Sequence, residues 1–522
     1  MSSDLPAPIF WAVLLAMTVY GWGAIPHIDH PLGSDWGHYF TAAEYIWNPS
    51  EGLAYPDFRK PWFGWILGGL GQTFGYLESG QLIGRISLIL MMVAAAWLGV
   101  ALADRWAGLL GAATVVLMPL SMDGALWVNH YPLLGAVVGL SFAASASAGR
   151  WPGLGWVGLA GLTAGASLAI DFRGGIAVPV AMVLVALGSQ GLGLRTTGFR
   201  ILLLGGLIAG PLVHDAWLQR TFQVPQLRVE QQLLVQRKGT LEQIAQGAVG
   251  GDALRQACRN ESPGRFRVES AWSACGVALR KSGLERLSSM RLIPAPSFLL
   301  LGLLSLIPAR WARSGRLRSS LAPAIIFMAP IASVFIGMGW VTYFDRYILP
   351  FASLLAVFAA VGISRLVRFL VGRSFWSGGV VMVLGGIVAM KVWPGLDARN
   401  LDSPETFRSS EYHAGIFAKW VKREMRPGDG LVDCAGLAVD SLLQPQKIDY
   451  VRFPPGDAEC VDLVKAPRKR KGRSFLITMH RDLPTGAKIS DLPFDADAVA
   501  AEGWMDISAE MPLDGYRLWV SK

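Results

Sequence analysis

The stretch LIGRISLILMMVAAAWLGVALA, residues 82–103, decides the fold class of this chain. Arg85, near its start, is the only charged residue in it. An α-helix rises about 1.5 Å per residue, so about 20 apolar residues cross the ~30 Å hydrocarbon core of a bilayer. We therefore predict a transmembrane helix here.

Comparable apolar stretches recur along most of the chain. We predict eleven membrane spans, at residues 8–25, 82–103, 106–121, 131–148, 154–170, 175–190, 201–217, 293–309, 321–340, 347–364 and 377–393. Charged residues make up only 16% of the chain, whereas soluble proteins carry about 25%. The N-terminal MSSDLPAPIF has no basic segment, so we interpret the first span as a retained helix and not a signal peptide. The predicted fold class is an all-α polytopic membrane bundle.

The arginines in the short connections predict the orientation. They follow spans two, four, six, eight and ten, as Arg105, Arg150, Arg195, Arg200, Arg310, Arg313, Arg316, Arg318, Arg365, Arg368 and Arg373. Short loops rich in Arg and Lys face the cytoplasm. We therefore predict a multi-pass protein of the bacterial cytoplasmic (inner) membrane, with its N-terminus inside. The same rule accounts for the net charge of +9, so we predict no nucleic-acid partner.

The opposite side then receives the long segments 26–81, 218–292 and 394–522. The last of these is predicted to be a small soluble α/β domain outside the membrane, following a membrane domain at 1–393. Its EYHAGIFAKWVKREM (411–425) has helical periodicity, and GLVDCAG, KIDYVRF, RSFLITMH and GYRLWVSK are short β-rich runs.

All four cysteines fall on this predicted outer side, which is an oxidising compartment. Four cysteines allow three pairings, and two of these lie in one loop while two lie in the tail. We favour the two local pairs, Cys258 with Cys275 and Cys434 with Cys460.

Ionisable residues gather at the outer ends of the predicted spans and are almost missing at mid-membrane depth. They are Asp35, Arg59, Lys60, Arg85, Asp123, His130, Asp171, Arg173, Asp345 and Arg346. Ion-coupled transporters bury such residues deeper. If the helix ends converge, they form a cavity with fixed cations, which fits a ligand with an anionic head and a lipid tail. In YPDFRKPWFGWILGG (55–69), Arg59 and Lys60 offer donors to a phosphate, or alternatively contact bulk lipid headgroups.

Four motifs occur in a characteristic order. They are Asp35-Trp36-Gly37-His38-Tyr39 followed by Ala42-Ala43-Glu44; Tyr55, Phe58, Lys60 and Pro61 leading into Phe74-Gly75; Gly84-Arg85; and Arg346-Tyr347 with Pro350. This ordered set resembles the C-type membrane glycosyltransferases, in the branch of the protein O-mannosyltransferases and the lipid A aminoarabinose transferase. The resemblance implies an enzyme that moves a sugar from a polyprenyl-phosphate donor to an acceptor glycan, lipid or protein at the outer face.

The resemblance also implies roles for single residues. Asp35 matches the catalytic carboxylate that faces the acceptor, and Lys60 matches the lysine that holds the lipid phosphate. Arg346 becomes a second phosphate ligand, with Arg59 and Arg173 as supporting cations. Cations beside the phosphate lower the barrier to its departure, and a carboxylate accepts the proton of the incoming hydroxyl. A single displacement of this kind inverts the sugar.

One position departs from the family pattern. Many relatives carry a second aspartate before the fourth helix, where this chain has Asn129-His130-Tyr131. Asp123 or Asp171 could substitute for it, or His130 could take the role. We expect the aromatic and imidazole rings of Trp36, His38, Tyr39, Tyr55 and Tyr347 to shape the sugar pocket. An alternative role for Asp35 is to cap the helix that follows it.

No cofactor is predicted. His27, Asp29 and His30 are the one group that offers an alternative, a divalent metal site, because imidazole and carboxylate are ordinary ligands. Two other functions compete with the transferase. One is a transporter or flippase of lipid-linked glycans, and the other is a non-catalytic scaffold whose tail domain binds a partner.

Overall fold

The structure is a computed structural model of the chain. It describes residues 4–27, 36–49, 55, 59–151, 153–224, 251–260, 275–277, 302–306, 325–326, 328, 349–371, 375–392, 410–435, 449–452, 472–479, 496–510 and 516–521. The chain divides into two compact units. The membrane unit comprises Met1–Pro26, Ala54–Trp65 and Gln81–Arg399, and the second unit comprises His27–Leu53, Ile66–Gly80 and Asn400–Lys522.

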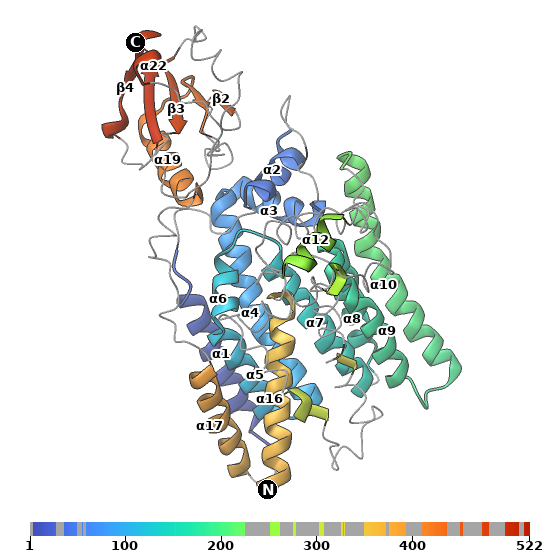
Figure 1. The fold of residues 1–522 in the computed structure, drawn as a ribbon. Coiled ribbons are helices and arrows are strands. Elements are labelled where there is room, and N and C mark those ends of the chain that lie inside the picture. The colour runs from blue at the N-terminus through green and yellow to red at the C-terminus, as the bar shows by residue number, and fades with distance from the viewer. Residues whose placement is uncertain are drawn as a thin grey trace. The chain divides into compact units, whose positions relative to one another are not determined.

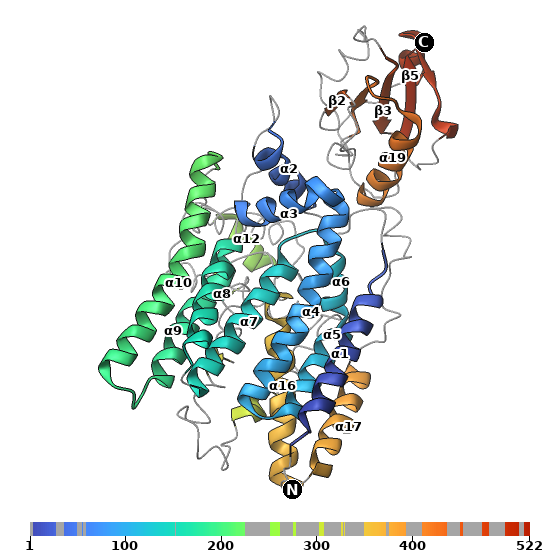
Figure 2. The ribbon, with the colours of Figure 1, turned by 180° about the vertical axis from the view of Figure 1, so that it is seen from behind.

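The membrane unit is a bundle of helices (Figures 1 and 2). Its main helices are α1 (Ala7–Gly23), α4 (Tyr76–Leu102, which begins in the second unit), α5 (Arg105–Leu117), α6 (Pro119–Leu126), α7 (Tyr131–Arg150), α8 (Leu154–Ile170), α9 (Ala177–Gly188), α10 (Leu194–Thr221), α16 (Leu349–Val371) and α17 (Phe375–Val392). Shorter elements are η1 (Phe172–Ile176), α12 (Asp252–Asn260) and η3 (Leu304–Leu306). Helix α8 packs between α7 and α10, and α16 packs on α5 and α7.

Four of the described helices are long and apolar enough to cross a membrane, namely α4, α7, α10 and α16. Helices α5 and α6 meet at a bend of 55° and together would make a fifth. Shorter apolar helices occupy the predicted spans 8–25, 154–170, 175–190 and 377–393. The polytopic helical class is therefore confirmed. The number of eleven spans stays a prediction, because 321–340 and most of 293–309 lie outside the described residues.

The arginines that predict the cytoplasmic side also cap helix ends. The last carbonyls of a helix have no partner within it and need donors from elsewhere. Arg150 donates from Nη1 to the carbonyls of Val100 and Ala101 at the end of α4, at 3.0 Å each. Arg200 donates from Nη2 to the carbonyl of Ala148 near the end of α7. Arg150 and Arg200 therefore have two roles: they predict the cytoplasmic side of the membrane, and they bind carbonyl groups at helix ends.

Asp104 joins two helices at this side of the bundle. It is the N-cap of α5 and accepts a hydrogen bond from the Ala107 backbone at 2.9 Å. Its other oxygen, Oδ2, accepts from Ser364 Oγ at 2.9 Å and lies 2.8 Å from Arg368 Nη2, both on α16. We name Asp104, Ala107, Ser364 and Arg368 the Asp104 cluster. It fixes α5 against α16.

Two glycines bring α8 and α10 close together. Gly161 and Gly165 are four residues apart and therefore lie on one face of α8. A Cβ atom at Gly165 would lie only 2.4 Å from the carbonyl oxygen of Ile208, and one at Gly161 only 2.7 Å from that of Leu204. Small residues at this spacing allow the backbones of membrane helices to approach. The contact sets which part of α10 faces the end of α8.

The second unit carries the sheet. Its described elements include α2 (Trp36–Trp47), α19 (Ser410–Glu424), β1 (Gly430–Asp433), β2 (Asp449–Arg452), β3 (Ser474–Met479), α22 (Ala496–Ala501), β4 (Trp504–Asp506), η7 (Ser508–Glu510) and β5 (Tyr516–Ser521), with α3 (Pro61–Phe74) shared between the units. The strand order is β2-β1-β3-β5-β4, with β1 parallel to β2 and β3 and β5 antiparallel to its neighbours. Leu476, Trp504 and Trp519 form its core. The predicted small α/β tail is present.

The cysteines differ from the prediction in one respect. Cys434 is disulfide-bonded, and its predicted partner Cys460 lies outside the described residues. Cys258 and Cys275 are buried thiols, so the predicted 258–275 disulfide is not formed in the structure. Nearness in sequence was the only ground for that pair, and a disulfide also needs Cα atoms roughly 4.4–6.8 Å apart with Cβ vectors that converge.

Candidate functional site

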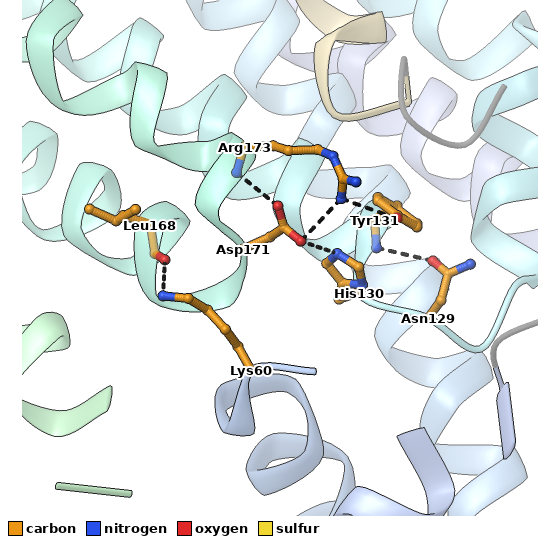
Figure 3. A network of polar contacts seen from close by, with 7 residues as sticks. All are labelled: Lys60, Asn129, His130, Tyr131, Leu168, Asp171 and Arg173. Carbon is orange, nitrogen blue, oxygen red and sulfur yellow. Dashed lines mark hydrogen bonds and ion pairs between the residues drawn. The ribbon is translucent and has the colours of Figure 1, made fainter. Parts of the chain in front are cut away.

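Two helix ends bring His130 and Asp171 together. Helix α7 begins at Tyr131, with Pro132 in its first turn, so His130 is the residue that precedes it. Asp171 ends α8 and caps η1, where its Oδ1 accepts from the Arg173 backbone at 2.8 Å. Its Oδ2 lies 2.9 Å from His130 Nε2, and both side chains are buried (Figure 3).

Arg173 completes this group. Its Nη1 lies 3.3 Å from Asp171 Oδ2 and donates to the Tyr131 hydroxyl at 3.3 Å. The guanidinium also lies over two rings, 4.8 Å from the Phe172 centroid and 5.7 Å from that of Tyr131, where cation–π attraction applies. We name His130, Tyr131, Asp171 and Arg173 the His130 network. It combines an imidazole, a carboxylate and a guanidinium in one buried place (Figure 3).

The charge states in the His130 network follow from its surroundings. Burial lowers the pKa of His130 below its usual value; Asp171 opposes this without outweighing it, and the cations Arg173 and Arg59 add to the lowering. Burial alone would raise the pKa of Asp171, but Arg173 and the bond to His130 outweigh it and hold that pKa below its usual range. Asp171 is therefore a carboxylate beside a neutral imidazole. Since a carboxylate only accepts, His130 Nε2 carries the proton and Nδ1 the lone pair.

A second group surrounds Lys60. Its Nζ donates to the carbonyl of Leu168 at 2.7 Å, which is one of the last carbonyls of α8, and to Asp215 Oδ2 of α10 at 3.2 Å. Gln219, one turn further along α10, donates to the same Oδ2 at 2.9 Å. We name Lys60, Leu168, Asp215 and Gln219 the Lys60 cluster (Figure 3 shows its Lys60–Leu168 contact). Lys60 thus caps α8 and pairs with a carboxylate at once.

Aromatic packing holds α3 against α10 beside the Lys60 cluster. The His214 ring lies 4.9 Å from that of Trp65 and 5.5 Å from that of Trp62, both edge-on, and stacks on Trp217 at 5.6 Å. Because Trp62 follows Lys60 by two residues and His214 adjoins Asp215, these rings fix where the two charged groups meet.

Arg59 and Tyr55 link the two groups. Arg59 is close enough to His130 for its charge to contribute to the lowered pKa of that imidazole. Tyr55 is buried; burial raises the pKa of its hydroxyl, and the charge of Asp215 adds to this. Tyr55 therefore stays protonated. The predicted residues Tyr55, Arg59, Lys60, His130 and Asp171 thus belong to one region of the membrane unit.

Other predicted site residues lie elsewhere. Asp35, Arg346 and Tyr347, the side chain of Trp36, and Asp29 and His30 of the alternative metal site lie outside the described residues. In the second unit, His38 is exposed and Tyr39 is buried. Within the described part of the chain no three His, Cys, Asp or Glu residues are placed to hold a metal ion.

Asp215 is the site residue that the sequence analysis missed. It lies inside the predicted span 201–217, whose composition indicates an apolar helix. A carboxylate within a membrane span is itself a signal, because a buried charge needs a partner or a function. The partner, Lys60, is 155 residues away in sequence.

The elements and this region define the class of protein. It is a polytopic helical membrane protein with a small α/β unit and ionisable groups buried where helix ends meet. No protein-family model matches the chain, and no curated protein sequence matches it.

Among solved structures, ArnT from Cupriavidus metallidurans in the apo state matches with a TM-score of 0.57 and 14% identity, over 99% of this chain and 98% of that chain. The same enzyme bound to undecaprenyl phosphate gives identical values. An oligosaccharyltransferase from Archaeoglobus fulgidus matches with a TM-score of 0.43 and 11% identity, over 90% and 69%. The chain therefore has the fold of ArnT, and the predicted resemblance is confirmed at the level of the fold.

Proposed function

We propose that the chain is a membrane glycosyltransferase that moves a sugar from a polyprenyl-phosphate donor to an acceptor at the outer face. One observation carries the proposal. In a chain with the fold of ArnT, Lys60 lies in the same buried region as Arg59 and the His130 network. Lys60 and Arg59 offer cations for a lipid phosphate, and the imidazole and carboxylate of the His130 network lie in the same region as groups that can accept a proton. The ArnT structure bound to undecaprenyl phosphate supports the choice of donor class.

The cations bind the donor and stabilise its leaving group. A phosphate that departs from the anomeric carbon gains negative charge in the transition state, and donors fixed in advance next to it lower the barrier. Lys60 is the first of these, with Arg59 and Arg173 as supporting cations and Arg346 as the further predicted ligand. Arg173 is held in place by Asp171 and Tyr131, so its orientation is set before the donor binds.

The transfer itself is a single displacement. Asp35 accepts the proton of the acceptor hydroxyl, the hydroxyl oxygen attacks the anomeric carbon, and the bond from that carbon to the phosphate oxygen breaks. The polyprenyl phosphate leaves with the electron pair, and the configuration at the anomeric carbon inverts. His130, kept neutral by burial and oriented by Asp171, takes the acceptor-side place that relatives give to a second aspartate.

The test measures release of undecaprenyl phosphate from undecaprenyl-phosphate sugars by the purified full chain in nanodiscs. We expect release by the wild type and a 10- to 100-fold weaker donor affinity for Lys60→Ala, since a hydrogen bond to a charged group is worth about 1.5–3 kcal/mol. Arg195→Ala, which removes an exposed cation from the far end of α10, serves as the control.

Lys60→Ala also leaves Asp215 without its cation, so a loss of function could arise from misfolding. The double variant Lys60→Ala/Asp215→Asn removes both charges and separates the two effects. A folded double variant that binds donor as tightly as Asp215→Asn alone would contradict the role of Lys60. A wild type that binds no polyprenyl phosphate would contradict the proposed function.

A further inference from the structure

Asp215 has the contacts of an incompletely satisfied buried carboxylate. Its side chain is 7% exposed, and its Oδ2 accepts from both Lys60 and Gln219. Its Oδ1 is buried and accepts no hydrogen bond within the described part of the chain. A buried polar atom without a partner costs about 1–3 kcal/mol, so such atoms are rare unless they serve a function. The unpartnered Oδ1 makes this carboxylate costlier to bury than Asp104, which uses both of its oxygens.

The fold nevertheless holds Asp215 firmly in this position. The close contact of Gly161 and Gly165 with α10 fixes the register of the two helices. Asp215 follows Ile208 by seven residues, or two helical turns, and so lies on the same face of α10, beside the end of α8 where Lys60 is bound. A fixed negative charge thus stands against the lysine that is proposed to bind the lipid phosphate, and Lys60 remains 21% exposed.

The donor and the product of the proposed reaction differ in charge. A polyprenyl-phosphate sugar is a phosphodiester with a single negative charge. The polyprenyl phosphate that leaves is a monoester, whose second ionisation has a pKa of about 6, so it carries close to two negative charges at neutral pH. A carboxylate beside the site repels the second charge as well as the first, and the repulsion is larger for the product.

We propose that Asp215 is a specificity-determining residue that makes the phosphate site prefer the singly charged donor over the doubly charged product. The inference rests on the proposed function. In the donor-free protein Asp215 neutralises Lys60, and the donor phosphate displaces it from Nζ. After transfer, the added charge of the monoester meets Asp215, and the product leaves.

The experiment compares two unreactive lipids, undecaprenyl phosphate and its methyl ester, which carries the single charge of a diester. Their dissociation constants are measured at pH 8 for the full chain in nanodiscs. Asp215→Asn has the same shape and can still accept from Lys60, so it changes charge alone. We expect it to tighten binding of the monoester about tenfold more than binding of the methyl ester, a difference of one pKa unit of charge interaction.

A matched variant separates charge from position. Gln219→Met keeps the charge of Asp215 and removes one of its donors, and the ratio of the two dissociation constants should stay within about twofold of wild type. At pH 5, where the monoester is mostly singly charged, the excess effect of Asp215→Asn should vanish.

The inference would be overturned if Asp215→Asn changed the dissociation constants of both lipids by the same factor. It would also be overturned if Gln219→Met changed the ratio of the two dissociation constants as much as Asp215→Asn does. Each result would show that Asp215 only positions Lys60. A wild type that binds neither lipid would instead refute the proposed function, so the two failures are distinct.

Discussion

The Asp104 cluster and the Lys60 cluster both join a carboxylate to a cation across two helices, yet they are built differently. Asp104 uses both oxygens, one on the Ala107 backbone and one toward Ser364 and Arg368. Asp215 uses one oxygen only. The cation of the first is 7% exposed and that of the second 21%. A buried pair whose carboxylate uses both oxygens indicates a structural clasp, whereas a partly open pair whose carboxylate uses one oxygen indicates a site that exchanges partners.

The largest effect that tests this difference is on stability. Asp104→Ala removes a helix cap and leaves Arg368 as an uncompensated buried charge, so we expect a loss of about 3–5 kcal/mol in the free energy of unfolding. Thermal unfolding in detergent measures it. Asp104→Ala combined with Arg368→Met removes both charges and should recover part of the loss. If Asp215→Asn destabilised the protein as much as Asp104→Ala, both carboxylates would have to be regarded as structural, which contradicts the difference between the two clusters.

The second effect is on turnover. Asp35→Asn keeps the shape of the side chain and its ability to cap a helix, and it removes the proton acceptor. We expect kcat to fall at least ~100-fold with the fold intact, since a general base contributes about 10²–10⁴-fold. A cap alone would cost about 1 kcal/mol of stability and leave turnover nearly normal. A folded Asp35→Asn protein with the wild-type rate would end the catalytic role.

The helical class, the α/β tail and its β-rich runs could be predicted, because length, composition and periodicity are local properties. The α19 helix, for example, begins at Ser410 and ends at Glu424 where EYHAGIFAKWVKREM predicts it. The pairing of Cys258 with Cys275 could not be predicted, because sequence distance does not determine whether two Cβ atoms face one another.

The site was predictable in its parts and not in its contacts. Alternation of the spans placed His130, Asp171 and Lys60 on one side of the membrane. That Lys60 would end α8 and meet Asp215 depends on how Gly161 and Gly165 seat α10, which is a property of packing. The sequence shows the carboxylate of Asp215 within span 201–217, but it does not show that Lys60 is its partner.

A third effect tests this packing. Gly165→Ala adds a Cβ atom 2.4 Å from the Ile208 carbonyl, so the backbones must separate. We expect a loss of about 1–3 kcal/mol in stability, as for other overpacked contacts, and weaker binding of undecaprenyl phosphate because Asp215 and Lys60 shift. Gly205→Ala on α10 is the control, since its Cβ would enter open space. Equal behaviour of the two variants would show that the α8–α10 contact does not set the site.

The smallest expected effect separates the His130 network from the Asp104 cluster by pH. Burial lowers the folded-state pKa of His130 from 6.5, so between that lowered pKa and 6.5 the unfolded chain binds a proton that the folded protein does not. Stability then falls as pH falls through 6.5, by up to about 1.4 kcal/mol between pH 7.5 and 5.5 for one such histidine. Asp171 does not contribute in this window, because its pKa is lowered as well and it stays ionised.

Melting temperatures across this range should therefore decline less steeply for His130→Gln than for the wild type. The Asp104 cluster contains no histidine, so the double variant Asp104→Ala/Arg368→Met should keep the wild-type slope. An unchanged slope in His130→Gln would mean that the imidazole has the same pKa in the folded and unfolded protein, and a steeper decline would mean that it is protonated in the folded protein. Either result would contradict a neutral acceptor-side group.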